Sequence, residues 1–233
     1  MVLGTFRRDH VVEQAAAAAG LPILDGYSPA GAVVARGVRF ANGVFVEAHQ
    51  APSPDPSGPP PLLGLSGSVD AAEALAERHG WRVSVQRRPE DLAVPAEPWS
   101  ILSFRRRQGA LSSLFVIDYV AGATAAPDFA GPLYIVASTP DRGPRLQRVW
   151  LAVAEIQGAI RDLTRLGFAP GGVVRSTVAP HAGWLLRGQR GDVVLHEAGE
   201  GPEGITRFDI EPGHRAGARV VEPAPGLVMV LGR

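Results

Sequence analysis

The most constraining feature of the sequence is a segment pattern that occurs three times. Each copy begins with a short apolar stretch, passes through a polar junction into a helix-like stretch, and ends with a glycine and a second apolar stretch. The three copies are Met1–Ile23, Pro61–Val83 and Val149–Phe168. Gly20, Gly80 and Gly167 fall at matching places, where the left-handed end of a helix favours glycine. We interpret each copy as strand, helix, glycine, strand.

The periodicity inside and after each copy defines a larger unit. Val12, Ala15, Ala16 and Ala19 recur at the spacing of one helix face. Three strand-like runs follow the glycine of every copy, and Asn42-Gly43 joins two of them with a strong hairpin signal. The runs are Leu21–Leu24, Ala32–Phe40 and Val44–Ala48 in the first copy, Trp81–Gln86, Trp99–Arg105 and Leu114–Val120 in the second, and Phe168–Arg175, Trp184–Arg187 and Val193–Glu197 in the third. The predicted fold class is therefore α+β, built from tandem β-α-β-β-β units.

Proline-rich spacers set the expected boundaries of these units. We expect a first unit at 1–58, a second at 59–122, a linker with an extra strand (Leu133–Ala137) at 123–145, a third unit at 146–200, and C-terminal strands at 201–233. The tail strands are predicted at Ile205–Ile210, Ala218–Val221 and Leu227–Leu231. Because an open sheet edge is a liability, we expect the first two units to pair across one cleft. The third must then pair with the tail strands or with another chain.

Charge and composition exclude several kinds of chemistry. Basic and acidic residues cancel to a formal charge of +0, which disfavours a general binder of nucleic acid or of acidic membranes. The chain has neither cysteine nor lysine, so disulfides, thiolate metal sites, cysteine nucleophiles and Schiff-base lysines are excluded. No apolar run reaches the roughly 18 residues of a membrane helix, and no secretory signal is evident. We expect a cytoplasmic protein.

Three stretches carry a resemblance to a known superfamily. They are Val38–Gln50 (VRFANGVFVEAHQ), Ser113–Tyr119 (SLFVIDY) and Arg148–Phe168, which ends in Leu-Gly-Phe. In this order they resemble the vicinal oxygen chelate superfamily, which includes glyoxalase I, bleomycin-resistance proteins and extradiol dioxygenases, and especially its glyoxalase-like domain proteins. The resemblance implies that β-α-β-β-β units pair into an open curved sheet around a cleft.

The resemblance also implies where metal ligands would lie. Metal-dependent members use a His near the start of each first strand and an acidic residue on each fourth strand. The first-strand places fall here near Met1, near Pro60 or Pro61, and on Arg148, and none of these side chains is a usual ligand. The fourth-strand places carry Glu47, Asp118, and His196 or Glu197. The branch's Gly-x-His-Pro segment reads Gly26-Tyr27-Ser28-Pro29, with Ser28 in place of His.

Glu47 and Asp118 are the candidate catalytic residues. Each follows an apolar strand run, and two carboxylates that face one cleft could share a proton or an ion. The alternative is that each is a strand-end carboxylate paired with an Arg. His49 lies two residues beyond Glu47 on the same strand face, so this pair is the candidate for a divalent metal, although an exposed strand-end His is the alternative.

Further side chains are candidates for ligand binding. The set is His49, Tyr119, Arg105, Trp184 and His196. Arg105 begins an Arg-Arg-Arg run that suits an anion, or simply a solvated turn. His181 and His196 flank one hairpin and could approach each other, and His10 is predicted in the first helical turn with Asp9 as N-cap.

Three hypotheses for function follow. The first is a glyoxalase-like lyase, isomerase or oxygenase acting on a small organic metabolite, with an atypical or absent metal site. The second is a non-catalytic protein that sequesters a drug or metabolite. The third is a structural or partner-binding member whose cleft is filled. The expected partners are a small-molecule ligand and a second copy of the chain in a homodimer.

Overall fold

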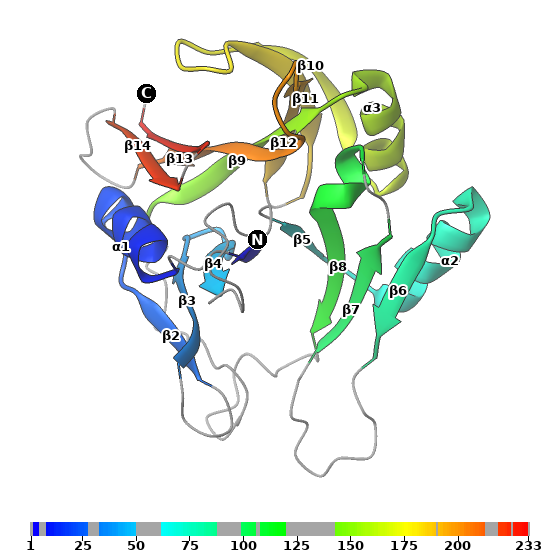
Figure 1. Cartoon of the computed structure of the whole chain (residues 1–233), viewed down its shortest axis with the longest axis horizontal. Helices are drawn as coiled ribbons and strands as arrows, with labels where there is room; N and C mark the ends of the chain where they lie inside the picture. The colour runs from blue at the N-terminus through cyan, green and yellow to red at the C-terminus, as the bar shows by residue number, and fades with distance from the viewer. Residues whose placement is uncertain are drawn as a thin grey trace.

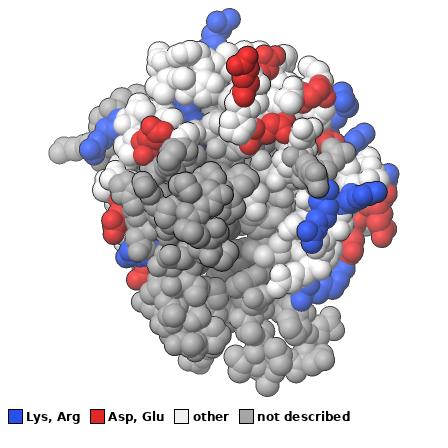
Figure 2. Space-filling model, in the orientation of Figure 1, with Lys and Arg blue, Asp and Glu red and all other residues white. Residues whose placement is uncertain are grey.

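The computed structural model describes residues 2–4, 8–27, 33–49, 62–87, 99–105, 108–119, 143–189, 191–212, 219–224 and 226–232. Three sheets organise this part of the chain. A seven-stranded sheet lies at the top of Figure 1, and two four-stranded sheets lie below it, one on each side. Acidic and basic side chains are interspersed over the described part of the face in Figure 2, in agreement with the balanced charge of the sequence.

The first unit forms one four-stranded sheet and a helix. Its elements are β1 (Val2–Gly4), α1 (Arg8–Ala19), β2 (Leu24–Tyr27), β3 (Val33–Arg39) and β4 (Phe45–His49). The strand order is β1-β4-β3-β2, with β1 parallel to β4 and the other pairs antiparallel. The first strand therefore lies beside the fourth strand, and α1 crosses between β1 and β2.

The second unit repeats this arrangement. Its elements are β5 (Leu63–Ser66), α2 (Val69–His79), β6 (Val83–Gln86), β7 (Trp99–Phe104), the short 3-10 helix η1 (Ala110–Ser113) and β8 (Leu114–Tyr119). The order β5-β8-β7-β6 matches that of the first unit. The side chain of Ser68 accepts a hydrogen bond from the backbone N–H of Ala71 at the start of α2. Gly80 ends the helix at φ +63°, the left-handed conformation that the aligned glycines predict.

The third unit is completed by the C-terminal strands. It contains β9 (Arg145–Val153), α3 (Ile156–Arg165), β10 (Ala169–Arg175), β11 (Ala182–Arg187) and β12 (Asp192–Glu197), and it is followed by β13 (Gly204–Glu211), β14 (Arg219–Ala224) and β15 (Leu227–Leu231). Together these strands form one sheet in the order β10-β11-β12-β9-β13-β15-β14. β13 is antiparallel to β9 and parallel to β15. The tail thus has the strand directions of a fourth unit that lacks a helix in its described part.

Helix α1 covers the tail strands as well as its own sheet. It contacts β3 and β4 in the first unit and also β14 and β15, and it lies directly below β14 in Figure 1. Ala15, Ala16, Ala18 and Ala19 are all buried, whereas Ala17 is exposed. Small side chains allow close approach on two sides, so α1 takes the place of the helix that the fourth unit lacks.

The second unit is joined to the same sheet through α3 and Glu203. η1 contacts α3, β9 and β13. The two carboxylate oxygens of Glu203 accept hydrogen bonds from the backbone N–H of Gly109 in the second unit (2.8 Å) and of Ala154 in the third (2.6 Å). The seven-stranded sheet is therefore the common support of both four-stranded sheets.

Most of the predicted helices and strands are close to those of the structure. The helix begins at Arg8, so Asp9 lies inside its first turn and is not the N-cap. The extra strand expected at Leu133–Ala137 lies outside the described residues. The third unit pairs with the tail strands, one of its two expected alternatives. No strand pair joins the two four-stranded sheets within the described ranges, so pairing of the first two units across a cleft stays a prediction.

No helix in the described part of the chain has both the length and the apolar character needed to cross a membrane.

Candidate functional site

The two faces of the seven-stranded sheet differ in chemistry. Val149, Leu151 and Phe208 belong to the main core together with α3. Trp150 lies between Val149 and Leu151 on β9, so it points to the opposite face, where it packs with Leu185. This opposite face, which we call the polar face, carries charged side chains from β9, β12 and β13.

A buried ion pair is at the centre of the polar face. Nε of Arg207 donates to Oδ1 of Asp209 at 2.6 Å, and Nε1 of Trp150 donates to Oδ2 of the same carboxylate at 2.9 Å. The Arg207 guanidinium also lies 4.5 Å from the centre of the Trp150 ring, a cation–π distance. The side chain of Arg207 is only 3% exposed. We call Trp150, Arg207 and Asp209 the Asp209 cluster.

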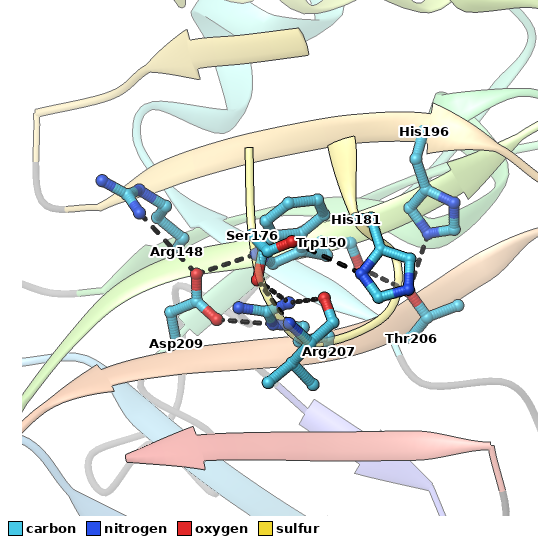
Figure 3. Close-up of polar contacts among 9 residues, drawn as sticks. Arg148, Trp150, Ser176, His181, His196, Thr206, Arg207 and Asp209 are labelled. Carbon is cyan, nitrogen blue, oxygen red and sulfur yellow. Dashed lines mark hydrogen bonds and ion pairs between the residues drawn. The ribbon is translucent and has the colours of Figure 1, made fainter. Parts of the chain in front are cut away.

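The segment between β10 and β11 closes over this cluster. Nη1 of Arg207 donates to Oγ of Ser176 at 2.8 Å and to the backbone carbonyl of Val178 at 2.7 Å. The two ends of the segment are joined by a hydrogen bond from the Ser176 N–H to the carbonyl of His181 at 2.8 Å. Figure 3 shows Arg207 between Asp209 and this segment. The chain's own side chains therefore fill this part of the polar face.

His196 on β12 lies at the edge of the cluster. Its Nδ1 is 2.9 Å from the carbonyl oxygen of Glu197, and its Nε2 is 2.8 Å from Oγ1 of Thr206. Burial lowers the pKa of His196, although the Glu197 carbonyl opposes this in part. In the neutral ring, Nδ1–H donates to Glu197 and Nε2 accepts from the Thr206 hydroxyl. Both ring nitrogens are thus engaged within the protein.

Arg148 is the second cation beside Asp209, and it is held less firmly than Arg207. Its Nη1 is 3.8 Å from Oδ2 of Asp209. Its Nε is buried and has no hydrogen-bond partner. Two guanidinium groups therefore share one carboxylate, and the group of three carries a net positive charge.

A hollow of about 530 Å³ opens beside Arg148 at the end of the sheet where β9 and β12 begin and β13 ends. We call it the end pocket, and the described residues that line it are Asn42, Arg145, Leu146, Gln147, Arg148, Gln189, Gly191, Asp192 and Glu211. Asn42, from the turn between β3 and β4, donates through Nδ2 to the carbonyl of Leu146 at 2.8 Å. The neighbouring Ala41 N–H donates to the carbonyl of Pro144 at 2.9 Å. These bonds between the first and third units fix the pocket wall.

Glu47 and His49 lie on β4, in register with β1. Val46 and Ala48 are buried in the core beside α1, so Glu47 is directed to the opposite face of this sheet. It is half-buried, and its backbone lies opposite Val2 and Gly37. His49 shares this strand face by position, but its side chain lies outside the described residues. A metal site at this pair stays a prediction.

Asp118 lies on the helix side of its sheet, whereas Glu47 lies on the side away from its helix. It has the strand parity of Leu114 and Val116, which pack in the helix-side core. Its Oδ2 accepts a hydrogen bond from the backbone N–H of Val69, the first residue of α2, at 3.4 Å. A carboxylate at a helix N-terminus is stabilised by the unpaired N–H groups there. In the structure, Asp118 contacts the start of a helix.

The other ligand-binding candidates are dispersed. Arg105 is exposed and donates through Nη2 to Oγ of Ser84 at 2.9 Å. Trp184 is 40% exposed and has the strand parity of Leu195, so it lies on the helix side of the sheet, away from His196. The side chain of Tyr119, like that of His10, lies outside the described residues.

Comparisons with known proteins give matches of structure only. No family model matches the chain, and no curated relative does. A hypothetical protein from Staphylococcus aureus superimposes with a TM-score of 0.63 at 8% identity, over 99% of this chain and 96% of that one. A catechol 2,3-dioxygenase gives 0.58 at 14% identity, over 99% and 90%. A Mn(II)-bound glyoxalase from Novosphingobium aromaticivorans gives 0.57 at 14% identity, over 90% of this chain and 63% of that one, so this chain spans less than two thirds of that protein.

The strand order, the tandem units and these neighbours agree. The chain has the fold of the vicinal oxygen chelate superfamily. The sequence resemblance predicted this fold, and at identities this low the structural likeness shows the fold alone.

The first-strand ligand place of the third unit does not suit a metal ion, and His196 at the fourth-strand place is bonded through both ring nitrogens. The first-strand place carries Arg148, followed by Trp150 on the same face, and neither offers a lone pair. Asp209 on β13 is engaged by Arg207 and Trp150. Among the described residues, no three His, Cys, Asp or Glu side chains come together as a metal site.

Sequence reasoning missed the centre of the polar face. Arg207 and Asp209 were part of an expected strand, but they were not candidates. Charged residues two apart on a strand are typical of a solvent-exposed face. The covering segment contacts this pair through Ser176 and Val178, and no local sequence pattern predicts that contact.

Proposed function

We propose that this protein binds a small molecule without the help of a metal ion, as a non-catalytic member of the glyoxalase-like fold. The observation that supports this most directly is the Asp209 cluster. Arg148 stands at the first-strand ligand place of the third unit, and the carboxylate beside it, Asp209, is held in a buried, hydrogen-bonded pair with Arg207. The Asp209 carboxylate is already bonded to Arg207 and Trp150, so it is not available to a metal ion on the polar face.

The end pocket supports the proposal that the protein binds a small molecule. Its volume of about 530 Å³ lies within the usual range for ligand pockets, about 300–1,000 Å³. Hydrogen bonds from the turn at Asn42 to β9 hold its wall in place. A preformed pocket reduces the ordering that binding would otherwise require.

Two measurements on the purified chain of residues 1–233 test this proposal. Elemental analysis should find no stoichiometric divalent metal, and added divalent metals should not raise the melting temperature. A thermal-shift screen of small metabolites should find compounds that raise it, because a ligand of the native state stabilises that state.

The Glu47→Ala variant separates the proposal from its alternative. A bound metal that is lost in Glu47→Ala would contradict the proposal and support a metal-dependent lyase, isomerase or oxygenase at the first unit. Absence of any stabilising compound in a broad screen would favour a structural role instead.

A homodimer is also proposed, through the outer strand β10. Among the described strands, β10 pairs only with β11. Its residue Val173 is 58% exposed and lies opposite Trp184 of β11. An unpaired strand with an apolar residue is suited to association with a second copy. Light scattering should give twice the chain mass, and Val173→Lys should give the monomer.

A further inference from the structure

We infer that the end pocket binds a small zwitterion, a molecule with one carboxylate and one ammonium group, such as a free amino acid. This rests on the proposed function and names its site and ligand class. The site lies at the end of the polar face, beside the Asp209 cluster, and its lining comes from strand ends and from the turn of the first unit at Asn42.

The carboxylate of the ligand is assigned to Arg148. Its side chain lines the pocket and is a quarter exposed, and its Nη1 is 3.8 Å from a carboxylate that Arg207 engages at 2.6 Å. A guanidinium whose neighbouring carboxylate is already engaged by another arginine is suited to a planar anion such as carboxylate. Occupation by a carboxylate would balance the positive charge shared by Arg148, Arg207 and Asp209.

The ammonium group is assigned to the acidic side of the same pocket. Asp192 on β12 lies directly opposite Arg148 on β9, and Glu211 lies opposite Arg145. None of these opposite pairs comes within ion-pair distance, and no other ion pair holds Asp192 or Glu211 in the described part of the chain. Positive and negative side chains thus line the pocket wall without forming ion pairs with each other.

The balance of charge decides between ligand classes. Among the described residues, the wall carries two cations, Arg145 and Arg148, and two anions, Asp192 and Glu211. A simple anion would be repelled by the carboxylates, and a simple cation by the guanidinium groups. A zwitterion meets both, and the amides of Gln147 and Gln189 add neutral hydrogen-bonding groups at the rim.

The test is calorimetric titration of the chain of residues 1–233 with the twenty free amino acids. The best binder is then compared with its deaminated acid and its decarboxylated amine. We expect the amino acid to bind more tightly than either analogue. Arg148→Gln should weaken binding by about 10- to 100-fold, the range for loss of a charged hydrogen bond.

Two further variants keep the outcome interpretable. Asp192→Asn should weaken the binding of the amino acid but not the binding of the deaminated acid. Arg161→Gln, which removes an exposed guanidinium on α3, should bind like the unmodified chain. Melting curves of each variant show whether it is folded.

The outcomes separate this inference from the proposed function. If amino acids fail to bind while other compounds stabilise the chain, the ligand class is wrong and the proposed function stands. If a folded Arg148→Gln binds as the unmodified chain does, the site is wrong. If no compound binds at all, the proposed function fails with it.

Discussion

The Asp209 cluster and the end pocket share one carboxylate but differ in how they use it. On the cluster side, Arg207 is almost fully buried and its donors are taken by Asp209, Ser176 and the Val178 carbonyl. On the pocket side, Arg148 is a quarter exposed, and its Nε has no partner. Asp209 thus contributes to a buried, internally bonded cluster with Arg207, and on its other side it contacts Arg148, which lines the end pocket.

The difference teaches where function can lie in this chain. A buried cation whose hydrogen bonds are all internal cannot exchange them for a ligand without a large loss of stability. A partly exposed cation such as Arg148, whose contact with Asp209 is long, can gain a partner at a smaller cost. We therefore expect variants of the cluster to affect folding, and variants of the pocket to affect binding.

The largest expected effect compares the two arginines. Arg207→Gln should lower the free energy of unfolding by about 3–5 kcal/mol, because it leaves Asp209 buried without its principal cation. Arg148→Gln should lower it by less than about 1 kcal/mol, as for a partly exposed pair with a long contact. Urea denaturation of both variants measures the difference. Equal losses would show that the two arginines belong to one cluster.

The next effect isolates the hydrogen bond from Trp150. Trp150→Phe removes the indole N–H that Asp209 accepts. Trp81→Phe is the matched control, because Trp81 is also buried and packs edge-on against Phe104. Trp150→Phe should cost about 1.5–3 kcal/mol more than the control, the value of a charged hydrogen bond. Identical costs in chemical denaturation would assign Trp150 a packing role only.

Ser176 tests the segment that covers the cluster. Its Oγ accepts from Arg207 Nη1 and from the Val178 N–H. Ser176→Ala should lower the free energy of unfolding by about 1–2 kcal/mol, because both donors lose a partner. Thr177→Ala, at the exposed neighbouring position, should change it by less than about 0.5 kcal/mol. A faster proteolytic cut within this segment in Ser176→Ala alone would locate the loss there.

How far the sequence predicts this molecule depends on which interactions are local. The repeated units were predictable because helix periodicity and the glycines after each helix act within one segment. The extra burial of Ala18 was not, because α1 contacts β14 from a part of the chain about 200 residues away. An alanine run predicts a helix, but it does not say how many neighbours the helix has.

The two candidate carboxylates show the same limit at the scale of a strand. Glu47 is flanked by Val46 and Ala48, so alternation gives its face. Asp118 follows the continuous apolar run Leu114–Ile117, in which Phe115 is buried on one face and Val116 on the other. A strand that is apolar on both faces carries no alternation signal. A shift of one residue reverses the direction of a side chain, and the sequence could not fix it.

The smallest expected effect is a pH dependence at the edge of the cluster. Burial lowers the pKa of His196 from its usual value of 6.5, so the folded chain binds this proton less readily than the unfolded chain does. The contribution to stability is complete above about pH 6.5, and it is lost as the pH falls from there toward the lower folded pKa. The free energy of unfolding should therefore fall as the pH is lowered below about 6.5, and it should fall less in His196→Gln. His181→Gln, which alters an exposed histidine on the covering segment, should keep the full dependence. If His181→Gln flattens the profile and His196→Gln does not, the titrating group belongs to the covering segment. The pH would then affect how this segment covers the Asp209 cluster, and the sheet residue His196 would not be responsible.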